Sequence, residues 1–256
     1  MRTALIHTVV TLLLITGSTC AAAEWGSLAG RFLFDGDAPE QKPVNVTKDV
    51  EFCTKHTPLD EAVVVGEDGG LQNVVVYLYL GRGDSVDVHP DYEASAEEPA
   101  VLDNKGCAFV PHVLLMRTSQ PLLIKNSDDV GHNTNVALMG FNVIVPAGGD
   151  TTMNVSKALR IPSPVNCNIH PWMVGYVFAR DDPYMSTSGA DGKFEIANVP
   201  AGEHTFVFWH EAAGYLKDVK YQGGEANRRG RAEVTIAAGE TLDLGDIKVS
   251  ARLLKK

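Results

Sequence analysis

The chain has 256 residues, of which 45% are hydrophobic and 21% are charged, so it can bury a core and is long enough for two domains. This composition excludes intrinsic disorder as a description of the whole chain, and its glycines and prolines, which follow no period, exclude a collagen-like or coiled-coil protein. The net charge of -10 argues against nucleic acid or an anionic membrane surface as a partner.

Residues 1–23 are predicted to be a secretory signal peptide. Arg2 gives a short positive start, an apolar run follows it, and Ala21-Ala22-Ala23 supplies small residues for cleavage. No later stretch approaches about 18 uninterrupted apolar residues, so no membrane span is expected. We therefore expect a periplasmic or secreted protein; a lipid anchor on Cys20 is the alternative.

The mature chain shows the patterns of strands rather than helices. Runs rich in β-branched, aromatic or aliphatic residues predict strands at 28–34, 71–80, 120–126 and 174–179. The acidic and alanine-containing segment 91–100 is either a solvated loop, which we favour, or a short helix.

Charge and proline interrupt the apolar pattern at Asp181-Asp182-Pro183, where we place a domain boundary. Four further strands are predicted after it, at 193–199, 203–211, 234–236 and 242–249. A Pro-Ala-Gly turn separates the first two of these strands, which fits a hairpin. The sequence therefore predicts an all-β protein of two sandwich-like units, 24–182 and 183–256.

Residues 184–252 resemble the carboxypeptidase regulatory-like, transthyretin-like β-sandwich module. The resemblance depends on Tyr184-Met185-Ser186-Thr187, on Ala190-Asp191-Gly192-Lys193-Phe194 and on Val199-Pro200-Ala201-Gly202-Glu203-His204. It implies a scaffold or contact role for this second small β-sandwich, and not catalysis.

Metal-ligating side chains are concentrated between residues 120 and 180. Cys167, His170 and Met173 have the spacing Cys-x2-His-x2-Met, and His132 follows a predicted strand and a polar turn about thirty-five residues earlier. One thiolate and two imidazoles in a trigonal arrangement, with a weak axial thioether, form a blue-copper electron-transfer site. The thiolate favours Cu(I) and shares its charge with Cu(II), while imidazoles suit both states. One type 1 copper is therefore expected.

The pattern resembles the cupredoxins, the blue-copper family that includes plastocyanin, azurin and amicyanin. The short loop from Cys167, with proline after its histidine, is most similar to amicyanin, and His132-Asn133 matches the first-ligand region. The resemblance implies a Greek-key sandwich with N-terminal additions and copper ligands His132, Cys167, His170 and Met173. It assigns to Asn133 the hydrogen bonds that tie the first-ligand loop to the thiolate loop.

The same resemblance implies how electrons leave the copper. His170 would lie at the surface inside an apolar patch, with Trp172 beside it as part of a docking surface. The partner would be a redox protein, such as a c-type cytochrome or a periplasmic dehydrogenase.

Three cysteines remain after signal-peptide removal, and an odd count in an oxidising compartment suggests one disulfide and one cysteine with another role. With Cys167 assigned to copper, Cys53 and Cys107 are expected to be bonded to each other. The alternative is a second metal site made of Cys53, His56, Cys107 and His112.

The leading functional interpretation is a single-electron carrier that is not an enzyme. Copper storage or delivery, and an electron-transfer subunit of a copper enzyme, are the alternatives. Four turn residues are interpreted as solvated: Asp128, Asp129, Asp181 and Asp182.

Overall fold

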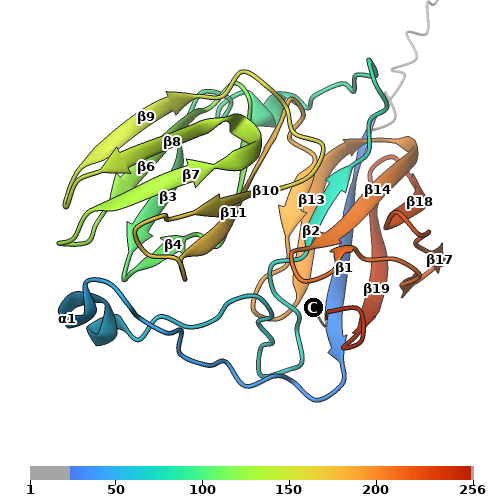
Figure 1. The fold of residues 1–256 in the computed structure, drawn as a ribbon. Coiled ribbons are helices and arrows are strands. Elements are labelled where there is room, and N and C mark those ends of the chain that lie inside the picture. The colour runs from blue at the N-terminus through green and yellow to red at the C-terminus, as the bar shows by residue number, and fades with distance from the viewer. Residues whose placement is uncertain (1–23, 255–256) are drawn as a thin grey trace, which may run out of the picture.

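The computed structural model describes residues 24–254, and these residues form two β-sandwiches that lie side by side (Figure 1). The prediction of an all-β protein is confirmed. The predicted signal peptide and Cys20 lie outside the described residues. No helix within residues 24–254 is long and apolar enough to cross a membrane.

The first sandwich contains one four-stranded and one five-stranded sheet. The four-stranded sheet has the order β4 (Ala108–Val110), β3 (Ala100–Lys105), β6 (Pro121–Asn126) and β9 (Asp150–Asn154). The five-stranded sheet has the order β5 (Val113–Arg117), β11 (Val174–Arg180), β10 (Ser163–Asn166), β7 (His132–Val136) and β8 (Phe141–Val145). Strand alternation directs residues such as Leu122, Ile124 and Val165 into the core between them.

The second sandwich contains two larger sheets and a two-stranded ribbon. One sheet has the order β13 (Lys193–Pro200), β1 (Trp25–Asp35) and β19 (Thr241–Ser250). The other has the order β12 (Met185–Thr187), β2 (Val75–Leu78), β14 (Gly202–His210) and β15 (Gly214–Tyr215), with β18 (Arg231–Ile236) also paired to β14. The ribbon joins β16 (Lys220–Tyr221) and β17 (Gly224–Glu225).

The predicted boundary at Asp181-Asp182-Pro183 does not separate the two sandwiches in sequence, so the division into 24–182 and 183–256 is wrong. The N-terminal strand β1 lies between β13 and β19, and β2 lies between β12 and β14. Leu28 and Phe32 of β1 are fully buried in the core of the second sandwich. A local apolar pattern identifies a strand but not its distant partner, and the parallel pair β1–β19 joins opposite ends of the chain.

The predicted hairpin between β13 and β14 is also wrong. Phe194 of β13 pairs with Gly30 of β1, whereas β14 pairs with β18 and β2 in the other sheet. The turn at Ala201 therefore carries the chain from one layer of the sandwich to the other. A Pro-Ala-Gly turn between two strand-like runs is compatible with both connections, so the sequence pattern did not distinguish them.

Two long segments extend between the sandwiches, of which the first leaves and returns to the second sandwich and the second runs from one sandwich to the other. The strap, residues 36–62, leaves β1, runs beneath the first sandwich and returns (Figure 1), and it carries α1 (Val50–Cys53) and η1 (Thr54–His56) at its far end. Its two limbs are joined by backbone hydrogen bonds from Val44 to Pro58 and from Asp60 to Lys42. The second connection, between β2 and β3, contains the 3-10 turn η2 (Pro90–Tyr92) where a loop or short helix was expected. A further 3-10 turn, η3 (Ala137–Met139), follows β7.

A shared apolar cluster holds the two sandwiches together. Val75, Tyr77 and Val207 of the second sandwich are buried in one cluster with Val113 and Phe178 of the first.

Two buried ion pairs lie close to this apolar cluster. Arg180 Nη2 lies 2.7 Å from Asp182 Oδ2. Asp182 is buried, so the expectation that it is a solvated turn residue is wrong. His112 Nε2 lies 2.5 Å from the Glu211 carboxylate, and its Nδ1 lies 3.4 Å from Glu61 in the strap. Burial by itself lowers the pKa of His112, but its interactions with the Glu211 and Glu61 carboxylates outweigh burial and raise this pKa to about 9.

A fragment spanning residues 183–256 should not fold, because it lacks the inner strands β1 and β2 of the two larger sheets. Circular dichroism and amide dispersion in NMR spectra of this fragment should resemble those of an unfolded chain, with the mature protein as the control. A cooperative thermal transition of the isolated fragment would contradict the topology.

The His112 contacts should make stability depend on pH. A histidine with a raised folded pKa contributes stability that is fully present below its unfolded pKa of about 6.5 and is lost as pH rises through about 9. Urea unfolding should show the advantage of the wild type over His112→Gln falling by up to about 3 kcal/mol between pH 6 and 10, since one pKa unit corresponds to about 1.4 kcal/mol. The exposed His56→Gln variant is the control, and an advantage that does not change with pH would contradict the pairing.

Candidate metal centre

Three predicted ligands meet at one end of the first sandwich. His132 begins β7, while Cys167 and His170 lie in the loop between β10 and β11. Backbone hydrogen bonds from Cys167 to the Met173 carbonyl and from Met173 to the His170 carbonyl close this loop. The strand register thus fixes one ligand and the loop fixes the other two.

The donor atoms of these three side chains converge. The Cys167 Sγ lies 4.0 Å from Nδ1 of His132 and 3.6 Å from Nδ1 of His170. The donor atoms all lie within 4.8 Å of one another, and all three side chains are buried. Two nitrogens and one sulfur therefore face a common point in the protein interior.

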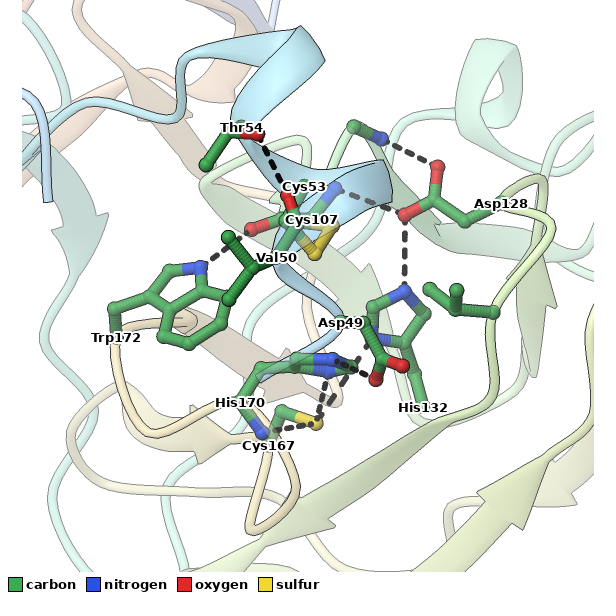
Figure 2. Close-up of a disulfide and its surroundings, with 12 residues drawn as sticks. Asp49, Val50, Cys53, Thr54, Cys107, Asp128, His132, Cys167, His170 and Trp172 are labelled. Carbon is green, nitrogen blue, oxygen red and sulfur yellow. Dashed lines mark hydrogen bonds and ion pairs between the residues drawn. A yellow bond between two sulfur atoms is a disulfide. The ribbon is translucent and has the colours of Figure 1, made fainter. Parts of the chain in front are cut away.

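A carboxylate holds the outer nitrogen of each imidazole (Figure 2). His132 Nε2 lies 2.9 Å from Asp128 Oδ2, and His170 Nε2 lies 2.8 Å from Asp49 Oδ2. Because an ionised carboxylate only accepts hydrogen bonds, each Nε2 carries a proton, and the Nδ1 atom that faces Cys167 is the nitrogen that would bind a metal, giving up its own proton where it holds one.

Asn133 joins the two ligand-bearing segments. Its backbone N–H donates to the Cys167 sulfur at 3.5 Å, and its side-chain oxygen accepts from the backbone N–H of Asn168 at 2.7 Å and of Ile169 at 3.2 Å. The sulfur also accepts from the backbone N–H of His170 at 3.4 Å. These contacts fix the loop and stabilise negative charge on the sulfur.

The pKa shifts of the paired groups agree with this geometry. Burial raises the pKa of the Cys167 thiol, but hydrogen bonds from His132 and the backbone outweigh burial and leave this pKa below its usual value. Burial lowers the pKa of His132, yet its bonds with Asp128 and Cys167 raise it to about 9. For His170 burial dominates and its pKa is lowered, although Asp49 acts in the opposite direction. The environment therefore favours a thiolate at Cys167.

Met173, the fourth predicted ligand, is buried in the same core cluster as Cys167. It lies at the end of the same short loop, where its backbone N–H donates to the His170 carbonyl and its carbonyl accepts from the Cys167 N–H.

The predicted disulfide between Cys53 and Cys107 is confirmed, with a Cα–Cα distance of 5.6 Å. It excludes the alternative second metal site, because the two sulfurs are bonded to each other and no thiolates remain for a metal. His112 pairs with Glu211 instead, and His56 is exposed and contacts the Phe52 ring.

The disulfide anchors the strap over the ligand loop (Figure 2). Asp49, just before α1, reaches His170, and Cys53 at the end of α1 is bonded to Cys107. His170 is fully buried, so the expectation that its ring lies at the surface is wrong. The sequence could not show this, because the covering segment belongs to the N-terminal extension and not to the ligand loop.

Trp172, the predicted docking residue, is half-buried, so only part of its side chain is exposed. Its Nε1 donates to the Cys107 carbonyl at 3.2 Å, and its ring centroid lies 5.1 Å from that of His170. It therefore packs between the ligand loop and the disulfide.

Sequence reasoning missed two residues of this centre, Asp49 and Asp128. Asp128 was interpreted as solvated, but it is buried and also accepts from the backbone N–H groups of Gly106 at 2.6 Å and Cys107 at 2.8 Å. Its position four residues before His132 was an available signal. No local pattern identifies Asp49, because only the folded strap brings it to His170.

Replacing both Cys53 and Cys107 by serine should lower the unfolding free energy by up to about 4 kcal/mol, the loop-entropy value for a loop of this length. Hydrogen exchange measured by mass spectrometry should become faster in residues 49–56. The Cys167→Ser variant, which keeps the bridge, is the control. Unchanged exchange in the double variant would show that the strap does not depend on the disulfide.

No protein-family model and no curated protein matches the sequence. Among solved structures, the chain is similar to a Cu-containing nitrite reductase (NirK) from Thermus scotoductus SA-01, with 17% identity and a TM-score of 0.28 over 40% of this chain and 25% of that chain. It is similar to an oxidised mutant of amicyanin (15% identity, TM-score 0.29, 34% of this chain and 84% of that chain). It is also similar to a purple cupredoxin from Nitrosopumilus maritimus (19% identity, TM-score 0.28, 32% and 99%).

Proposed function

We propose that the protein binds one copper ion through His132, Cys167 and His170 and carries single electrons. The observation that supports this proposal best is the convergence of two Nδ1 atoms and one sulfur in a buried site. Two imidazoles and a thiolate with a weak axial thioether are the donor set of a blue, type 1 copper centre, and Met173 is the candidate axial ligand.

The spacing of the donors fits a single first-row metal ion. With metal–sulfur and metal–nitrogen bonds of about 2.3 and 2.0 Å, a trigonal arrangement separates sulfur from nitrogen by about 3.7 Å. The separations of 4.0 and 3.6 Å lie on either side of this value. Only small side-chain movements would be needed for binding.

Bound copper would supply a one-electron Cu(II)/Cu(I) couple. The chain's own residues limit rearrangement between the two states, because Asp128 and Asp49 hold the imidazoles and Asn133 holds the loop around the sulfur. A centre that changes little between oxidation states favours electron transfer.

Burial of the donors favours a carrier over a delivery protein. Transfer of copper to another protein requires a partner ligand to reach the ion, and the strap with its disulfide blocks the His170 side. An electron does not need such an opening. In this proposal the chain is a carrier and not an enzyme.

The route to a partner passes through Trp172 in this proposal. Its half-buried ring contacts His170 and reaches the surface beside the exposed Pro171. The acidic chain suits a basic redox protein, such as a c-type cytochrome or a periplasmic dehydrogenase, because opposite charges speed encounter. We place the protein in the periplasm or outside the cell.

The mature protein loaded with copper should bind one ion per chain and, when oxidised, should show an intense visible band from charge transfer between the Cys167 thiolate and Cu(II). Cys167→Ser should remove this band. The His204→Gln variant is the control, since it removes an imidazole of the second sandwich that lies outside the proposed donor set and should keep the band. A band that survives in Cys167→Ser would eliminate the proposed site.

Repeated reduction and reoxidation in the presence of a Cu(I) chelator separates the carrier from a delivery protein. A carrier retains its copper through many cycles and exchanges electrons with an added c-type cytochrome. Loss of copper to the chelator on the first reduction would contradict the carrier role.

A further inference from the structure

A second site is suggested by a recess at the junction of the two sandwiches. It has a volume of about 240 Å³, and five arginines are among the residues that line it: Arg82, Arg160, Arg180, Arg229 and Arg231. The chain as a whole has 32 acidic and 22 basic residues, yet none of the residues lining this recess is acidic. The recess is therefore positively charged, whereas the protein as a whole is negatively charged.

The fold collects these arginines from distant parts of the chain. Arg82 follows β2, Arg160 precedes β10 and Arg180 ends β11. Arg229 lies in the turn before β18, and Arg231 is the first residue of β18. Both sandwiches therefore contribute guanidinium groups to one recess. Grouping like charges costs electrostatic free energy unless an anion compensates them.

Most of this positive charge is not neutralised within the protein. Arg180 is paired with Asp182 at 2.7 Å and donates to the Leu78 carbonyl at 3.0 Å. Across residues 24–254, none of the other four arginines of the recess has a carboxylate within 4.0 Å. Four cations are therefore available for a ligand.

Aromatic side chains position two of the arginines. The guanidinium of Arg231 lies 3.6 Å from the centroid of the Tyr79 ring, a stacked arrangement that leaves its N–H groups free to donate in their own plane. The hydroxyl of Tyr77 donates to the Arg160 carbonyl at 3.1 Å, which fixes that loop against β2. The recess is therefore partly organised before any ligand binds.

We propose that this recess binds a small anion with at least two acidic groups, carboxylate or phosphate. Guanidinium groups bind both kinds of group through paired, charge-assisted hydrogen bonds. The volume lies below the range of about 300–1,000 Å³ that is usual for drug-sized ligands, so the ligand is a compact polyanion and not a large cofactor. Because both sandwiches supply arginines, the ligand bridges them.

Citrate and inorganic pyrophosphate are the probes, used in isothermal titration calorimetry and thermal unfolding at constant ionic strength. We expect saturable one-site binding of at least one probe and a higher Tm in its presence. The Arg160→Gln, Arg229→Gln double variant should bind at least tenfold more weakly. The matched control, Arg228→Gln with Arg252→Gln, changes exposed arginines outside the recess and should bind within twofold of the wild type.

The identity of the preferred probe distinguishes a carboxylate ligand from a phosphate ligand. The proposal is overturned if neither probe gives saturable heat, or if both double variants lose affinity equally, since that indicates only general attraction of anions. It is also overturned if an acidic peptide binds while both probes fail, because the recess would then be a protein-docking surface. None of these outcomes depends on copper.

Discussion

The proposed metal centre depends on the pairing of each imidazole with a carboxylate on the side away from Cys167. Asp128 and Asp49 hold the Nε2 atoms of His132 and His170, so both Nδ1 atoms face the sulfur. Without these bonds each ring could rotate or take the other tautomer. The two Nδ1 atoms would then no longer be held facing the Cys167 sulfur. The positions of the two aspartates therefore decide whether the sequence motif becomes a metal centre.

Cys107 connects this pairing to the rest of the fold. Its N–H donates to Asp128, its carbonyl accepts from Trp172, and its sulfur is bonded to Cys53 in the strap. Cys107 thus contacts Asp128, which holds His132, and Trp172, which packs on His170. Its disulfide also fixes the strap that supplies Asp49. The strap begins at β1, which belongs to the second sandwich, so the second sandwich anchors the cover of a site in the first.

The sequence predicted the parts of the structure that local pattern determines. Strand alternation predicted the all-β class, and the Cys-x2-His spacing after a His-Asn pair predicted the convergence of His132, Cys167 and His170. The pairing of β1 with β19, the layer change at Ala201 and the contact of Asp49 with His170 depend on long-range packing. The arginine recess escaped notice for the same reason, since its members are scattered along the chain and each is unremarkable in its local sequence.

X-ray absorption at the copper edge of the copper-loaded mature protein tests the central claim most directly. The account predicts one sulfur and two imidazole nitrogens in the first coordination shell, with nearly the same distances in the oxidised and the reduced protein. A shell of nitrogen and oxygen alone, or one that loses its sulfur or an imidazole on reduction, would contradict it.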